Sequence, residues 1–274
     1  MGGKFEKIGL RTLTIVIGIP IILLIIHLGG IIFYISLSII ALLAALELWQ
    51  IFKKKDYQPA LISGFFATMF FLFQKTLSES ILFDSRLVFT LLFFLIIMEN
   101  FLLKPQKYNN LLNITLTIFI AIYLGHLLSF LIEMRELPNG KILLIFTLFT
   151  TWLSDVVAYL IGTKFGKRHP FPYLSPNKTL AGSLSGILGG GLCGLAFYLI
   201  LPIKPSLLVI IGIMAALFGQ LGDLFESMIK RNFGVKDSGH LLPGHGGILD
   251  CMDSVLFSVP ILYYYFSFFL INKL

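Results

Sequence analysis

Long apolar runs separated by short polar segments fill the chain from end to end. The runs fall at about residues 10–28, 31–52, 60–75, 87–103, 111–132, 142–162, 184–201, 206–229 and 248–271. A helix needs roughly 20 apolar residues to cross a hydrocarbon core of about 30 Å, and the third run is the short one. This pattern predicts an all-α polytopic integral membrane protein with about nine transmembrane helices.

The first run follows Lys4, Lys7 and Arg11, as the core of a signal peptide would. It is longer than such a core, has no clear small-residue cleavage site and leads at Gly29 directly into the second run. We therefore interpret it as a retained helix.

The distribution of lysine and arginine predicts the orientation of these helices. Positive residues concentrate in cytoplasmic loops, and successive loops alternate sides. With the N-terminus inside, 15 of the 21 Lys and Arg residues fall in cytoplasmic segments and 6 fall outside. The sequence thus predicts a cytoplasmic N-terminus and an external C-terminus.

Composition agrees with this assignment. The chain is 57% hydrophobic and 13% charged, with a mean hydropathy of +0.92, which excludes an ordinary soluble domain. Topology explains most of the net charge of +7, and no pattern favours nucleic-acid binding. Cys193 and Cys251 form neither a disulfide framework nor a metal-ligand spacing.

The two halves of the chain differ in chemistry. The few polar residues in the early runs include Glu47, Glu99, His27 and His126. Single residues of this kind more often pair with a neighbouring helix than perform chemistry. We expect residues 1–140 to form a scaffold of transmembrane helices and residues 141–274 to form the catalytic helices, with cytoplasmic loops at 163–183 and 230–247.

Carboxylates interrupt three of the later runs. They are Asp155 in the sixth, Asp223 and Glu226 in the eighth, and Asp250 and Asp253 at the start of the ninth. An acid at mid-bilayer costs roughly 2.5 to 3.5 kcal/mol, so several together need a cation or a water-filled cavity. The helical rise places them at a similar depth in the cytoplasmic half, where such an oxygen-rich cluster suits Mg²⁺. Alternatively, the acids pair with Lys230 and Arg231 or act as helix N-terminal charges.

The two loops carry the opposite charge. Chemistry-bearing residues are Ser175, Lys178 and Thr179 in the first loop and Lys236, His240 and His245 in the second. Gly-rich backbone beside Lys and Ser/Thr can hold phosphate oxygens, although neither loop has the order of a known nucleotide motif. Basic loops are also expected from topology alone, and the two His residues are equally suited to structural roles. Together with acids beside lipid, the loops indicate phosphoryl or nucleotidyl transfer to a lipid.

The densest polar stretch runs from Ser227 to Asp253. It carries, in order, Ser227, Lys230, Arg231, Lys236, Asp237, Gly239, Pro243, Gly244, His245, Gly246, Gly247, Asp250 and Asp253. This order resembles the C-terminal signature of the phosphatidate cytidylyltransferase (CDP-diacylglycerol synthase) family, and similarity extends over about residues 150–260. The chain departs from the family pattern at Cys251, where the signature has Arg, and at Ala181, where the pattern has Glu.

The resemblance implies that CTP and phosphatidic acid react to give CDP-diacylglycerol and pyrophosphate, with a divalent cation, in phospholipid biosynthesis. The lipid phosphate is already ionised near neutral pH, so positioning and charge neutralisation should dominate over base catalysis. A CTP-dependent polyprenol or dolichol kinase is one alternative. A cation-coupled transporter is another, disfavoured because the acids cluster near one face and no repeat is evident.

On this resemblance we assign roles to individual residues. The expected catalytic residues are Lys230, Arg231, Lys236, Asp237, His245, Asp250 and Asp253. The expected substrate-binding residues are Asp155, Ser175, Lys178, Thr179, Ser227, Gly246 and Gly247. Asp223, Asp250 and Asp253 are expected to hold Mg²⁺ or another divalent cation, and a second cation is compatible with the cluster.

The expected partners are CTP, phosphatidic acid and the lipid bilayer, without nucleic acid. For a bacterial chain we expect the cell (inner) membrane, with the active site on the cytoplasmic side. The small residues from Gly186 to Gly194 could serve a homo-oligomer, although close packing within one chain is the simpler interpretation.

Overall fold

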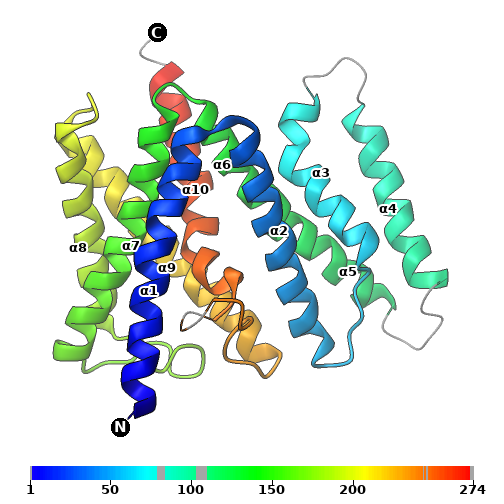
Figure 1. Ribbon diagram of the computed structural model, residues 1–274, viewed down its shortest axis with the longest axis horizontal. Helices are drawn as coiled ribbons and strands as arrows, with labels where there is room; N and C mark the ends of the chain where they lie inside the picture. The colour runs from blue at the N-terminus through cyan, green and yellow to red at the C-terminus, as the bar shows by residue number, and fades with distance from the viewer. Residues whose placement is uncertain (1, 79–83, 103–109, 243, 245, 272–274) are drawn as a thin grey trace. The chain divides into compact units, whose positions relative to one another are not determined.

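The computed structural model describes residues 2–78, 84–102, 110–242, 244 and 246–271 (Figure 1). The regular elements of these residues are helices, accompanied by one antiparallel bridge between Leu242 and Gly246. The helices are α1 (Gly2–Leu28), α2 (Gly30–Lys53), α3 (Ile62–Ser78), α4 (Ser85–Leu102), α5 (Asn110–Ile120), the π-helix η1 (Ala121–His126), α6 (Leu127–Glu136), α7 (Gly140–Phe165), α8 (Leu180–Ala196), the 3-10 helix η2 (Phe197–Leu199), α9 (Pro205–Asn232) and α10 (Ile248–Ile271).

Every predicted apolar run coincides with a helix, and the fifth run coincides with the continuous segment formed by α5, η1 and α6. Among the described residues, seven helical segments have the length and apolar composition to cross a membrane. The 17-residue α3 and the apolar stretch Thr14–Leu28 of α1 are shorter. An all-α polytopic membrane protein is thereby confirmed, whereas the orientation of the termini stays a prediction.

The chain forms two compact units that interleave along the sequence. Unit 1 comprises Met1–Ile15, Gly30–Ser129 and Phe233–Leu249, and unit 2 comprises Val16–Gly29, Phe130–Asn232 and Asp250–Leu274. The boundaries of these compact units differ from the predicted functional boundary between residues 140 and 141. That functional division stays a prediction.

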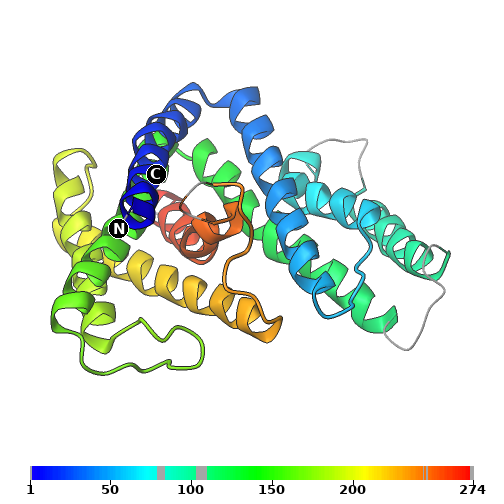
Figure 2. The ribbon, with the colours of Figure 1, turned by 60° about the horizontal axis from the view of Figure 1, so that its bottom comes forward.

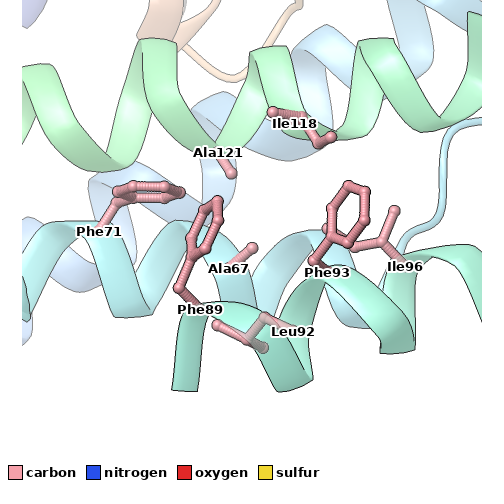
Figure 3. A pocket seen from close by; sticks show the side chains of 8 residues that line it. All are labelled: Ala67, Phe71, Phe89, Leu92, Phe93, Ile96, Ile118 and Ala121. Atoms are coloured by element: carbon pink, nitrogen blue, oxygen red, sulfur yellow. The ribbon is translucent and has the colours of Figure 1, made fainter. Parts of the chain in front are cut away.

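In unit 1, α3 packs against α4, α5 and η1 through an apolar cluster. Figure 3 shows a small pocket there, lined by Ala67, Phe71, Phe89, Leu92, Phe93, Ile96, Ile118 and Ala121. The pocket encloses about 20 Å³. Because all of its lining side chains are apolar, nothing orients a polar ligand, and we interpret it as part of the scaffold.

A carboxylate from α4 fixes the start of α3. Glu99 accepts hydrogen bonds from the backbone N–H groups of Leu61 and Ser63, at 3.0 and 2.8 Å. An acid at this position satisfies N–H groups that have no partner within the helix. Glu99 therefore pairs with a neighbouring helix, as expected for a single acid in the early runs.

In unit 2, α8 packs against both α7 and α9, and glycines permit the close approach (Figure 1). A Cβ atom on Gly190 would lie 2.6 Å from the carbonyl oxygen of Gly212 and from the Cβ of Ala216, both in α9. A Cβ atom on Gly189 would lie 3.0 Å from Val157 in α7. The small residues from Gly186 to Gly194 thus serve helix contacts within the chain.

We expect Gly190→Val to destabilise the protein by about 1–3 kcal/mol, because the added side chain forces α8 away from α9. The expected readout is a lower melting temperature in detergent. Leu188→Val is the matched control, since Leu188 lies on the same helix and is 65% exposed. An unchanged melting temperature for Gly190→Val would show that the two helices do not depend on this contact.

Candidate active site

A pocket of about 510 Å³ in unit 2 is lined by residues of α7, α8, α9 and the loop that joins α7 to α8. Figure 2 shows the ribbon of these helices and of the loop. Its lining includes five residues singled out from the sequence, namely Asp155, Ser175, Lys178, Thr179 and Asp223. It also includes His169, Asn177 and Gln220, which the signature does not contain. Small-molecule sites commonly have about 300–1,000 Å³, so this pocket has room for a substrate.

Thr179 ends the α7–α8 loop and begins α8. Its side chain is the N-cap of that helix, with Oγ1 accepting a hydrogen bond from the Gly182 N–H at 3.1 Å. A Cβ atom on Gly162 or Gly182 would lie 2.9 or 3.0 Å from the same Oγ1 atom. Glycine at these positions therefore allows the capped turn to sit directly against α7.

Lys178 connects the loop to α9. Its Nζ lies 2.7 Å from Asp223 Oδ2 and donates a hydrogen bond to the Gln220 carbonyl oxygen at 3.3 Å. Gln220 is held in turn, because its Nε2 donates to the Ser183 carbonyl at 3.0 Å. Ser227 Oγ lies 3.4 Å from Asp223 Oδ1. This network fixes one ammonium group at the pocket wall.

A second lysine lies between two other acids. Lys230 Nζ is 2.6 Å from Asp250 Oδ1 in α10 and 3.1 Å from Glu226 Oε1 one turn back in α9. The Glu226 side chain is fully buried. The alternative in which the acids pair with Lys230 therefore holds for Glu226 and Asp250, and Glu226 is a member that the signature did not indicate.

The two lysine-centred groups are linked by further carboxylates. Asp155 lies within electrostatic range of Asp223, and Asp253 within range of both. Asp253 also interacts with Glu226. Helices α7, α9 and α10 thus gather Asp155, Asp223, Glu226, Asp250 and Asp253 around Lys178 and Lys230. Carboxyl groups therefore outnumber lysines here, and keeping them ionised in a helix bundle is costly unless their charge is compensated.

The donor chemistry of this cluster fits a hard divalent cation. Among the described side chains, no three His, Cys, Asp or Glu residues converge as a complete metal cage. Asp223 and Asp250 are each turned toward a lysine. Mg²⁺ commonly binds through one or two carboxylates, waters and substrate phosphates, so a cluster whose possible ligands are carboxylate oxygens suits it without a cage.

The other predicted residues lie in different settings. Arg231 is exposed, and its Nε donates to the Leu174 carbonyl of the α7–α8 loop at 3.3 Å. Lys236 and Asp237 are exposed in the α9–α10 loop, which belongs to unit 1. Gly246, in the same loop, has a φ of 101° and bonds with Leu242 through the bridge. His245 lies outside the described residues.

The two departures from the family pattern lie at helix starts. Cys251 is exposed in the first turn of α10, between Asp250 and Asp253. Ala181 is half-buried in the first turn of α8. Neither side chain supplies the charge that the family pattern has there. Among the described residues, Lys178, which is half-buried, and Lys230, which is buried, form the ion pairs with these acids.

Fold and site together define a multi-pass membrane protein with a charged pocket built on its helices. The sequence model of the cytidylyltransferase family matches residues 9–269, and the chain belongs to this family. It is an enzyme of the nucleotidyltransferase type, which confirms the resemblance drawn from the signature.

Three curated relatives share the name phosphatidate cytidylyltransferase. The Bacillus subtilis protein is 43% identical over 152 residues, which span 54% of this chain and 56% of that protein. The Staphylococcus aureus (strain COL) protein is 33% identical over 255 residues, or 92% of this chain and 96% of the relative. The Staphylococcus saprophyticus protein is 34% identical over 259 residues, with the same coverage of 92% and 96%.

Proposed function

We propose that this protein transfers the cytidylyl group of CTP to phosphatidic acid, giving CDP-diacylglycerol and pyrophosphate. The name shared by its relatives supports the substrates. The observation that carries the proposal is the pocket in which Lys178 and Asp223 face each other beside Asp155. A lysine and two acids at one pocket suit a reaction that brings a nucleoside triphosphate and a lipid phosphate monoester together with a cation.

In this reaction an oxygen of the lipid phosphate attacks the α-phosphorus of CTP. The new bond joins that oxygen to the α-phosphorus, and the bond from the α-phosphorus to the bridging oxygen of the β-phosphate breaks, releasing pyrophosphate. Because the attacking oxygen is already ionised, no strong base is needed. The protein must instead bring two anions together and stabilise the charge of the leaving group.

The contacts of Lys178 support this role for the lysines. Lys178 has an ammonium group with three donors, of which two are directed to Asp223 and the Gln220 carbonyl, so one can reach a phosphate oxygen in the pocket. Lys230, Arg231 and Lys236 would contribute further positive charge to the phosphates. Ser175, Thr179 and His245 would add hydrogen bonds.

A divalent cation would be held by Asp223, Asp250 and Asp253, with Asp155 and Asp237 as further candidates. When bound, it neutralises phosphate charge and fixes the geometry of the triphosphate. The carboxylates also hold Lys178 and Lys230 in place, as the ion pairs of 2.7 and 2.6 Å indicate.

We also propose that the pocket faces the cytoplasm, with the N-terminus inside and the C-terminus outside. Lys164 in the last turn of α7 and Lys167 and Arg168 at the start of the α7–α8 loop are all exposed. Positive residues of this kind favour the cytoplasmic side, where CTP is available. For a bacterial chain the site would lie at the inner face of the cell membrane.

The test is to incubate purified protein with labelled CTP, Mg²⁺ and phosphatidic acid. The expected product is a lipid-soluble cytidine compound together with pyrophosphate. EDTA should abolish product formation, and added Mg²⁺ should restore it. Release of CDP upon addition of a polyprenol or dolichol would instead indicate a lipid kinase. The absence of any cytidylyl or phosphoryl transfer would contradict both enzymatic functions and favour transport.

A further inference from the structure

Glu47 lies in α2, far from the signature in the sequence, and its side chain is buried with 3% exposure. Its Oε1 accepts a hydrogen bond from the Ile248 N–H at 2.9 Å. Its Oε2 accepts from the Leu249 N–H at 2.9 Å and from Ser238 Oγ at 3.0 Å. One carboxylate thus joins the α9–α10 loop to the first turn of α10.

Two glycines of the signature are explained by this carboxylate. A Cβ atom on Gly239 would lie 2.6 Å from Glu47 Oε1. A Cβ atom on Gly247 would collide with Glu47 Oε2 and Ser238 Oγ. Three hydrogen bonds hold the Glu47 carboxylate, so it cannot move away from an added Cβ atom without losing them. Gly239 and Gly247 therefore make room for Glu47.

The same helix also holds the start of the loop. The rings of Phe52 in α2 and Phe233 lie 4.7 Å apart, centroid to centroid, and the Phe52 side chain is almost fully buried. The loop is thus attached to α2 near both of its ends, by an aromatic contact at residue 233 and by the Glu47 carboxylate at residues 238, 248 and 249.

We propose that Glu47 is a positioning residue for the transfer reaction, an inference that rests on the proposed function. Asp250 follows Leu249 directly in α10, and Asp253 comes one turn later. A negative charge at the N-terminus of a helix also stabilises that end. By fixing the first two N–H groups of α10, Glu47 sets where the helix begins and hence where its two acids lie.

The test compares Glu47→Gln with Glu99→Gln in purified enzyme. Glu99 is a matched control, because it also accepts backbone N–H groups at a helix start but lies outside the signature loop. In Glu47→Gln one carboxylate oxygen becomes an NH₂ group, which cannot accept a hydrogen bond from the backbone N–H of Ile248 or Leu249. We expect its kcat at saturating CTP and lipid to fall roughly 10- to 100-fold, with little change in KM for CTP. Glu99→Gln should retain the wild-type kcat.

Hydrogen–deuterium exchange supplies a readout that does not depend on activity. Exchange should accelerate at residues 248 and 249 in Glu47→Gln and at residues 61–63 in Glu99→Gln. A wild-type kcat despite faster exchange at residues 248 and 249 would overturn the proposal. Equal losses of kcat in the two variants would also overturn it, since they would indicate general destabilisation.

If Glu47→Gln does not fold, Ser238→Ala removes only one of the three hydrogen bonds. Its kcat should fall by less than that expected for Glu47→Gln, and an unchanged kcat would then contradict the proposal. The wild-type enzyme in the same assay tests the proposed function separately. A wild type without a cytidine lipid product would count against that function, while the exchange data would still report whether Glu47 anchors α10.

Discussion

Replacing Asp250 with asparagine is expected to lower the rate of cytidylyl transfer on the order of 10³-fold or more, while the protein stays folded. Asparagine has nearly the same shape but no charge. The change removes the negative partner 2.6 Å from Lys230 Nζ and one of the proposed cation ligands. Folding should persist, because Lys230 keeps its ion pair with Glu226.

Initial rates at saturating CTP and phosphatidic acid, with size-exclusion profiles and melting temperatures, check this expectation. Asp56→Asn is the matched control, because it makes the same chemical change at an exposed turn with a φ of 61°, a conformation that asparagine tolerates well. Near-normal turnover of Asp250→Asn would remove Asp250 from the catalytic and cation-binding roles.

The second large effect is expected from Lys230→Met, which should both inactivate and destabilise the enzyme. Methionine keeps most of the apolar length but leaves Glu226, with a fully buried side chain, and Asp250 without this cation. Breaking a buried ion pair from one side typically costs about 3–5 kcal/mol. The melting temperature in detergent should therefore fall clearly below that of the wild type.

The double variant Lys230→Met with Glu226→Gln separates stability from catalysis. Removing both charges leaves fewer uncompensated groups, so most of the lost stability should return. Activity should not return, because the lysine proposed to act on phosphate is still absent. A single variant that melts at the wild-type temperature would show that the Lys230 ion pairs contribute little to stability.

The helices were predictable from sequence because the bilayer imposes both length and apolar composition on each span. The helical rise predicted a similar level for Asp155, Asp223 and Asp253, and the structure brings these three acids close enough to interact electrostatically. Their partners were not predictable in the same way. Whether Lys178 meets Asp223, or Lys230 meets Asp250, depends on side-chain directions across helices that periodicity does not specify.

Glu47 is a second residue whose contacts could not be predicted from the sequence. In the sequence it is one acid in an apolar run, and its hydrogen-bond partners begin 191 residues later. Only the contacts reveal that it belongs with the signature. The π-helical turn at Ala121–His126 and the interleaved units likewise depend on long-range packing.

The capped start of α8 has one more consequence for the pocket. Thr179, Gly182 and Ser183 line the pocket, so the N-terminal turn of α8 lies at its wall. The aligned peptide dipoles of a helix give this end a partial positive charge, which favours anions. This potential comes from the backbone, so neither a rise in pH nor the loss of a single lysine removes it. We therefore expect the proposed binding of CTP at this pocket to be weakened, rather than eliminated, in variants of Lys178.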